Sequence, residues 1–464
     1  MRGWLLTLGC VAIAIAILAA RPVRTPGPLA RDFEAYWAAG SAWNALANPY
    51  GRAIWTAERG IAGVDAGRDE LLPFVGPPAT LLVWSIAARW PYQIATAAWW
   101  TMLGVSLLAL VATVLRGSGT PLRILPFFGA MLLALAFAPI SSDLALGQLA
   151  LPAFLGAAAL TVLADRSLPG AALGACLAFA QPNAALGLLS QLGRNRATLA
   201  MVLGAFATYS FGVVAAGWAW PLAYARVLAA HGAAERFIAI QFSPASIAYG
   251  FGANPWAART LGAFVALLAV ASAIATALRV ADRFARFAIF SALAPFVAGF
   301  FHEHDLVVAY AAALWCALRT RGAVRTVGLA GTLLVGIDWV GLAQRPSGIA
   351  QCLLLAISAF AAFVALGDNA GARYVAPAGA ATAALFAGAA ILATSYPMPV
   401  WPDTLAHFHA PIHATVAAVW LGEQRASGLL AAVPAWALLR SLSLLGCALL
   451  ASAIYRHSTC CRTA

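Results

Sequence analysis

The sequence predicts an all-α protein that crosses a lipid bilayer about 12 to 14 times. Of its 464 residues, 63% are hydrophobic and only 9% are charged, and the mean hydropathy is +0.85. A soluble domain carries roughly a quarter of its residues as charged side chains. Apolar runs of about 15 to 25 residues recur along most of the chain, and a helix needs roughly 20 to cross the hydrocarbon core. The composition therefore indicates a polytopic membrane protein.

The predicted spans follow one another with short polar interruptions. They lie near residues 4–20, 74–88, 94–115, 124–138, 149–164, 170–190, 197–218, 260–278, 286–301, 306–318, 326–342, 349–366, 375–394 and 427–452. The first could be a signal peptide or a transmembrane helix, and we favour an uncleaved anchor. Three stretches, 21–73, 219–259 and 395–426, are too long for turns and contain Trp, Tyr, Pro and His. This composition favours short external helices in the headgroup region.

The arginine distribution orients the second half of the chain. All 28 basic residues are arginines, and the formal net charge is +12. With both termini in the cytoplasm, the arginines of 194–196, 279–286, 319–325 and the C-terminal tail fall inside, as the positive-inside rule requires. In the first half of the chain, loops that alternate strictly between the two sides of the membrane fit the arginines less well. One segment between 74 and 164 is therefore expected to be re-entrant or to stop short of the far side. The basic residues form no stripe with interleaved aromatics, which excludes nucleic acid as a partner.

Asp32 is the first candidate for chemistry. Apolar residues in 31–47 recur at helical spacing and predict an amphipathic helix on the outer surface, with Asp32 at its N-terminal edge. One interpretation makes its carboxylate an N-cap, and the other makes it a general base at the membrane face. Glu34 is expected to point away from Asp32, and Arg31 is expected to meet lipid phosphate.

A second cluster consists of four titratable residues, His302, Glu303, His304 and Asp305, which interrupt an apolar stretch at 286–318. Ionisable groups inside a membrane are costly and are retained for a reason. The alternative is a solvated, inert outer loop. His-x-His with flanking carboxylates could ligate zinc, but a third and fourth ligand are not evident nearby, so we predict no metal. An acid/base or phosphate-binding role is preferred for the two histidines.

The segment 235–259 supplies the third group of candidates. Arg236 and Arg259 could bind a phosphate, since a guanidinium forms bidentate hydrogen bonds with it. They could equally be arginines that extend to the interface from an ordinary loop. The polar pairs Gly147-Gln148 and Gln181-Pro182 would more often be helix breaks or packed polar groups.

Several function classes lack their motifs. The sequence contains no P-loop, no dinucleotide-binding glycine pattern and no Gly-x-Ser-x-Gly elbow. Nucleotide hydrolysis and serine acyl transfer are therefore unsupported. An enzyme of this composition would use a substrate that is already in the membrane.

These motifs, taken in order, resemble glycosyltransferase family 87, whose members transfer sugars from polyprenyl phosphates. The resemblance begins with Asp32-Phe-x-x-Tyr36-Trp37-x-Ala-Gly and continues with Asn-Pro-Tyr at 48–50. Gly-Pro-Pro at 76–78 resembles the family's Tyr-Pro-Pro, Gly-Gln148 its Gly-Gln turn, Gln-Pro at 181–182 its Lys-Pro, and 302–305 its late histidine loop. The resemblance spans about residues 30 to 320. The family's Lys before Pro is a glutamine here, and its Tyr before Pro-Pro is Gly76.

The resemblance implies a C-type (GT-C) glycosyltransferase fold in the bacterial inner membrane, with the active site facing the periplasm. Residues 1–320 would form the catalytic module, and 321–464 would add C-terminal helices. Asp32 would be the general base of an inverting transfer of a hexose, mannose being one candidate, to a lipid or glycan acceptor. No cofactor is implied beyond the lipid-linked donor.

Donor and phosphate contacts are expected from the clusters described above. The candidates are Tyr36, Trp37, Gln148, Arg236, Arg259, His302, Glu303, His304 and Asp305. The competing hypothesis is a transporter or flippase of a lipid-linked or amphiphilic substrate. A transporter is expected to bury ionisable residues at the bilayer midplane and often contains an internal repeat, which this sequence does not show.

Overall fold

A computed structural model describes residues 30–65, 69–345, 349–366, 372–405 and 408–460. Within these ranges every regular element is a helix, which confirms the predicted all-α class. The predicted segment 4–20, with its signal-peptide alternative, lies outside the described residues.

Five helices of the described chain are long and apolar enough to cross a membrane. They are α5 (Tyr92–Gly117), α11 (Asn195–Ala216), α14 (Pro255–Arg279), the Val375–Ser395 part of α20 (Ala372–Ser395) and α22 (Pro434–Cys460). A sixth span is possible if α6 (Ile124–Ala136) and α7 (Ala138–Leu146), which meet at a bend of 68°, are one broken span. This bend lies where the arginines predict an irregular segment.

Within the described residues, the number of helices with the length and composition of a span is smaller than the 12 to 14 spans that hydropathy predicts, because many apolar segments form shorter helices. These helices are α8 (Ala150–Leu163), α9 (Leu168–Ala178), α10 (Pro182–Ala185), η2 (Leu186–Gln191), α15 (Arg283–Val297), η3 (His304–Ala309), α16 (Tyr310–Arg319), α17 (Gly322–Gly336) and α18 (Trp339–Gln344), while α19 (Ile349–Leu366) has 18 residues and is near the lower limit. Several are broken where proline or glycine interrupts a hydrophobic run, as Pro182 does between α9 and η2. Hydropathy alone does not separate a core helix from a spanning one.

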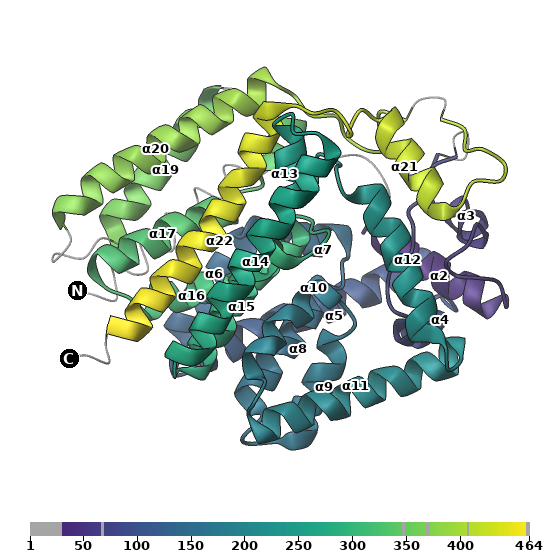
Figure 1. Ribbon diagram of the computed structural model, residues 1–464, viewed down its shortest axis with the longest axis horizontal. Coiled ribbons are helices and arrows are strands. Elements are labelled where there is room, and N and C mark those ends of the chain that lie inside the picture. Colours follow the sequence, from purple (N-terminus) through teal and green to yellow (C-terminus); the bar gives the residue numbers. More distant parts are fainter. Residues whose placement is uncertain (1–29, 66–68, 346–348, 367–371, 406–407, 461–464) are drawn as a thin grey trace.

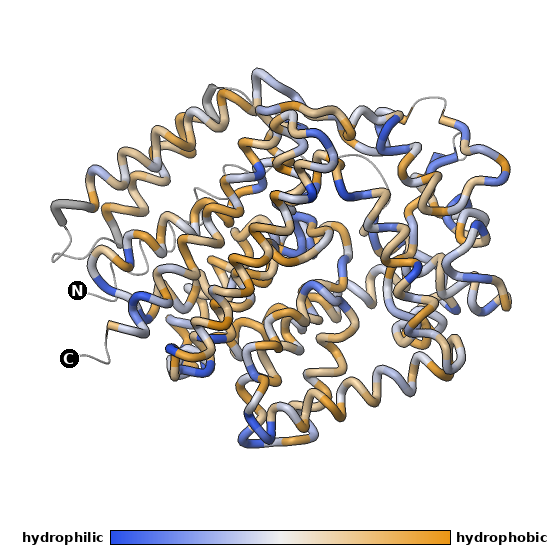
Figure 2. The backbone as a smooth tube through the Cα atoms, viewed as in Figure 1, coloured by the Kyte–Doolittle hydropathy of each residue, from blue (hydrophilic) through white to orange (hydrophobic). Residues whose placement is uncertain are grey.

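The long helices expose apolar side chains to the surroundings. In α14 only 11% of the most hydrophobic window is buried, and Phe264 and Leu267 are more than half exposed. Phe206 and Val214 are similarly exposed on α11. Hydrophobic residues cover most of these helices, and hydrophilic ones gather at their ends and in the loops (Figure 2). Exposed apolar faces of this length are typical of helices that contact lipid.

The first described helices form a compact group with α12 and α21. This group contains α2 (Phe33–Asn44), α3 (Ala53–Glu58), η1 (Pro78–Thr80), α4 (Leu81–Ala87), α12 (Trp220–Glu235) and α21 (Val416–Ala426), whereas α13 (Pro244–Gly250) packs on α14 and α22. Figure 1 shows α2, α3, α4, α12 and α21 on the right of the molecule, while α17, α19, α20 and α22 lie on the left. The helices α7 and η3 pack against each other between these groups.

The helix predicted on the outer surface at 31–47 exists, but its surface location is wrong. Most of α2 is buried, including Phe33, Glu34 and Tyr36. Small residues allow this: a Cβ on Gly40 would lie 2.1 Å from the carbonyl oxygen of Trp84, so α4 packs directly on the backbone of α2. The helical periodicity of aromatics therefore reflects packing on several sides. It does not mark a lipid-facing stripe.

Candidate functional site

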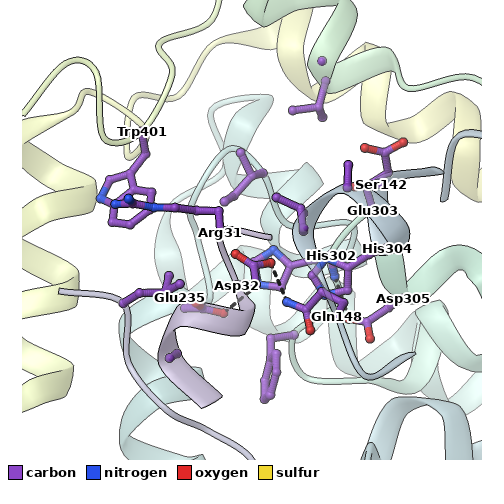
Figure 3. Close-up of a pocket in the computed structure, with 18 of the residues that line it drawn as sticks. Arg31, Asp32, Ser142, Gln148, Glu235, His302, Glu303, His304, Asp305 and Trp401 are labelled. Atoms are coloured by element: carbon purple, nitrogen blue, oxygen red, sulfur yellow. Dashed lines mark hydrogen bonds and ion pairs between the residues drawn. The ribbon is translucent and has the colours of Figure 1, made fainter. Parts of the chain in front are cut away.

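A cavity of about 600 Å³ lies between the N-terminal group of helices, α7, η3 and the segment that contains residues 400–403 and α21. Seven of the predicted site residues line it: Asp32, Tyr36, Gln148, His302, Glu303, His304 and Asp305. Figure 3 shows the carboxylate of Asp32 beside Gln148 and His302. Segments that are far apart in the sequence thus contribute to one site.

The carboxylate of Asp32 contacts a glutamine and does not cap its helix. Asp32 stands at the N-cap position of α2, but its side chain accepts no capping hydrogen bond. Instead Gln148 Nε2 donates to Asp32 Oδ2 at 2.5 Å, and the Tyr36 hydroxyl donates to Gln148 Oε1 at 2.5 Å. The carboxylate fixes which way the amide points, because it only accepts and so requires the NH₂ group of Gln148, which leaves the amide oxygen for the Tyr36 hydroxyl. The capping interpretation is therefore wrong.

The turn between α7 and α8 places Gln148 against Asp32. The backbone N–H of Asp32 donates to the Leu146 carbonyl at 2.9 Å. Gly147 has φ +74°, and a Cβ there would lie 2.7 Å from the Cβ of Ala30. Glycine is favoured because it adopts this left-handed conformation without steric cost and lets the two chain segments meet. The Gly-Gln pair is therefore part of the site, which the interpretation as a simple helix break did not anticipate.

A buried glutamate, Glu235 at the end of α12, organises the histidine side of the cavity. Its Oε2 lies 3.0 Å from His302 Nε2 and accepts from Gln241 Nε2 at 2.9 Å. Its Oε1 lies 2.9 Å from His231 Nε2 and accepts from the Trp420 indole N–H at 2.7 Å. Four donors around one carboxylate are enough to compensate the cost of burying its charge.

The charges in this cluster stabilise one another. Burial by itself would lower the pKa of His302, but the neighbouring Glu235 carboxylate outweighs it, with help from Asp305 and Asp32, and raises the pKa to about 9. Burial would likewise raise the pKa of Glu235, yet His231 and His302 hold it well below its ordinary range. His302 is therefore an imidazolium at neutral pH and Glu235 a carboxylate.

The two histidines of the 302–305 cluster differ. Their rings stack with centroids 5.4 Å apart, and burial lowers the pKa of His304, so His304 is neutral at neutral pH. A cationic and a neutral imidazole thus stand side by side in the cavity.

Asp305 anchors the loop that carries these histidines. It accepts hydrogen bonds from Gln181 Nε2 at 3.0 Å, from Asn183 Nδ2 at 2.9 Å and from the His302 backbone N–H at 3.0 Å. Because its oxygens are engaged in this way, Asp305 serves to position His302. The Gln-Pro-Asn sequence is the partner of this carboxylate.

Glu303 lies close to a second carboxyl group, that of Asp338, and both residues line the cavity. Burial and the nearby Asp338 raise the pKa of Glu303 well above its ordinary range, and burial also raises that of Asp338. Asp338 caps α18 by accepting from the Gly341 N–H at 2.5 Å. The two carboxyl groups are hydrogen-bonded to each other, which requires a proton on one of them, since two carboxylates only accept.

Arg31 contradicts its sequence interpretation. It does not point to lipid but forms ion pairs with Glu70 at 2.5 Å and Glu34 at 3.3 Å. Its guanidinium also lies over the Trp401 ring, 5.0 Å from the centroid, as Figure 3 shows. Arg31 lines the cavity, and its Nε has no hydrogen-bond partner among the described residues.

Three predicted contact residues lie away from the cavity. Arg236 and Arg259 are not among its lining residues, and the Arg259 guanidinium lies over the Phe237 ring instead. Trp37 is also absent from the lining and donates its indole N–H to the Trp90 carbonyl. The segment 235–259 does reach the site, but through Glu235 and not through its arginines.

The structure adds lining residues that sequence reasoning did not select. They are Arg31, His231, Glu235, Asp338, Arg345, Trp401, Asp403 and Trp420. A glutamate four residues after a histidine in an apolar region was the available signal for the pair in α12. The residues after 321 carried no such signal. The cavity is lined by residues from both predicted parts of the chain, 1–320 and 321–464.

Within the described residues, no group of three or more His, Cys, Asp or Glu side chains is arranged to hold a metal ion. No family model matches the chain, and no curated protein or solved structure matches it either.

Proposed function

We propose that the protein is a polyprenyl-phosphate-sugar-dependent hexosyltransferase of the GT-C type, located in the bacterial inner membrane with its cavity open to the periplasm. The observation that carries the proposal is the arrangement of Asp32 and His302. A carboxylate able to accept a proton and an imidazolium able to hold an anion line one cavity. The motifs that resemble glycosyltransferase family 87 supply Asp32, Tyr36, Gln148, Gln181 and residues 302–305 of its lining.

The cations of the cavity suit a single phosphate. Arg31, His302 and Arg345 are the candidates to hold it, in place of Arg236 and Arg259. Arg345 Nη2 forms an ion pair with Asp403 Oδ2 at 3.5 Å but has no hydrogen-bond partner among the described residues. Guanidinium groups with unused donors bind phosphate oxygens well. Protein cations can stabilise a monophosphate leaving group directly.

The proposed transfer proceeds with inversion. Asp32 removes the proton from an acceptor hydroxyl as that oxygen attacks the anomeric carbon of the donor. The bond from the anomeric carbon to the phosphate oxygen breaks, and its electron pair leaves with the polyprenyl phosphate. Gln148 holds one carboxylate oxygen through its amide N–H, which orients Asp32 and leaves the other oxygen for the acceptor. The acceptor would be a lipid or a glycan.

The proposal is tested with purified Asp32→Ala and Asp32→Asn variants, assayed for sugar transfer from polyprenyl-phosphate hexoses, mannose included. Loss of a general base costs about 10²- to 10⁴-fold in rate. Asp165→Asn is a suitable control, because the Asp165 side chain is 72% exposed and its only ion pair in the described part of the chain is with Arg283, at 2.5 Å. Wild-type turnover in both Asp32 variants, with normal folding, would exclude this base.

The same preparation distinguishes a transporter. Reconstituted vesicles that move a lipid-linked sugar across the bilayer without any glycosidic product would favour transport or flipping over transfer. A glycosylated acceptor that accumulates only with intact Asp32 would favour the enzyme.

A further inference from the structure

Arg440 is a buried arginine in the membrane-spanning helix α22, and the cavity does not include it. Its side chain is 1% exposed. An arginine inside an apolar helix costs about 2.5 to 3.5 kcal/mol on insertion scales, so its retention calls for a specific role. All of its hydrogen bonds in the described structure go to oxygens of neutral groups.

The guanidinium holds the connection between α12 and α13. Arg440 Nη1 donates to the Gln241 carbonyl at 2.8 Å, to Ser246 Oγ at 2.6 Å and, at 3.4 Å, to the Ile238 carbonyl. Nε donates to the Trp436 carbonyl of its own helix at 3.2 Å. The Gln241 and Ile238 carbonyls belong to a non-helical turn, where backbone oxygens lack helical partners and must be satisfied when buried.

The residue whose carbonyl Arg440 holds is itself a partner of the site. Gln241 is fully buried; its Oε1 accepts from the Phe301 N–H at 2.6 Å, and its Nε2 donates to Glu235. Its Nε2 also lies 3.1 Å from His302 Nε2. A second backbone bond, from the Phe242 N–H to the Phe301 carbonyl at 2.7 Å, ties the same turn to the histidine loop.

We propose that Arg440 is a positioning residue that holds Gln241 in place, so that the turn after α12 and the loop before η3 keep Glu235 against His302. The C-terminal helix thereby takes part in the site without touching it. The inference rests on the proposed function, since the histidine that it positions is the one assigned to the donor phosphate.

The alternative is that Arg440 only attaches α22 to α13, with no effect on the histidine. The two roles differ in the titration of His302. The groups facing that imidazole are Glu235 from α12, Asp32 from the start of α2, and His304 and Asp305 from its own loop. Displacement of Glu235 would leave burial as the main influence, and burial favours the neutral imidazole.

The experiment is a titration of histidine side chains by NMR, on the full chain with labelled histidine in lipid nanodiscs. The sequence contains seven histidines, and His302→Gln identifies the signal of interest. In the wild type the titration midpoint of His302 is expected at about pH 9. Arg440→Met is expected to lower it by at least about one pH unit, with a smaller decrease in Arg440→Lys, which restores a charge but not the fork of donors.

Arg456→Met is the matched control, because Arg456 is an exposed arginine of the same helix, and it should leave the midpoint unchanged. A folded Arg440→Met protein with the wild-type midpoint would overturn the inference. If Arg440→Met does not fold, Arg440→Lys and Ser246→Ala test the inference in its place. An unchanged His302 midpoint in both of these variants would contradict the positioning role of Arg440.

The titration needs no substrate, so its outcome is independent of the transfer assay. A shifted midpoint without any transfer from polyprenyl-phosphate hexoses would leave the positioning role standing and refute the proposed function. Sugar transfer by the wild type together with an unshifted His302 midpoint in Arg440→Met would support the proposed function and refute the positioning role.

Discussion

Replacing Glu235 with glutamine removes the charge that keeps His302 protonated while preserving the size of the side chain. The pKa of His302 is raised from 6.5 to about 9, and the imidazole is 19% exposed. This pKa difference of about 2.5 corresponds to a free-energy preference of about 3 kcal/mol for the imidazolium form of His302. In Glu235→Gln burial remains and the largest attraction is lost, while the smaller ones of Asp305 and Asp32 stay, so the His302 midpoint should fall below its wild-type value.

The same change alters the pH dependence of stability. Because the folded pKa of His302 lies above its unfolded value, its contribution is complete below about pH 6.5 and disappears as the pH rises through about 9. The wild type should therefore lose up to about 3 kcal/mol more than Glu235→Gln across this window. Burial also raises the pKa of Glu34 to about 8 and of Glu423 to about 9. These groups are common to both proteins, so their contributions cancel in the difference between the two curves, which reports the loss of the Glu235 carboxylate from its contacts with His302 and His231.

Histidine NMR gives the midpoint, and unfolding followed by circular dichroism between pH 6 and 10 gives the stability difference. His231→Gln is the control. It removes the other imidazole on Glu235 but keeps the carboxylate, so the His302 midpoint should stay near about 9. If Glu235→Gln leaves that midpoint unchanged, the electrostatic account of the site is wrong.

Three further substitutions test separate parts of the site. Tyr36→Phe removes the donor that orients Gln148 and should reduce sugar transfer about 5- to 10-fold, in line with one hydrogen bond of about 1 kcal/mol, measured as kcat at saturating donor. Arg345→Gln should raise the KM for the donor more than it lowers kcat, and an unchanged KM would remove Arg345 from the phosphate contacts. Gly147→Ala places a Cβ at φ +74° and against Ala30, so the melting temperature should drop; equal melting of the two proteins would contradict the tight turn.

The sequence predicts the class of fold and half of the site because these depend on local patterns. Hydropathy predicts helices in a membrane protein, and the clusters at 302–305 and around Asp32 are visible as scarce charges in an apolar chain. Gln148, the partner of Asp32, was among the predicted contacts because Gly-Gln148 resembles a family motif.

The missing half depends on contacts between distant segments. Glu235 reaches His302 only because a turn fixed by α22 brings α12 to the histidine loop, and no spacing in the sequence encodes that contact. Arg31 looked like a lipid contact because its partner Glu70 is remote in sequence. The described helices long enough to span are fewer than the predicted spans for a related reason, since whether a short apolar helix faces lipid or other helices is decided by packing.

The central claim is that the cavity beside Asp32 holds the phosphate of a polyprenyl-phosphate sugar. The most direct measurement is an electron cryomicroscopy structure of the protein with a polyprenyl phosphate bound. The account predicts density for the phosphate in contact with His302 and with Arg31 or Arg345, on the side of the cavity that Asp32 faces. A phosphate bound at Arg236 or Arg259, with the cavity empty, would contradict it.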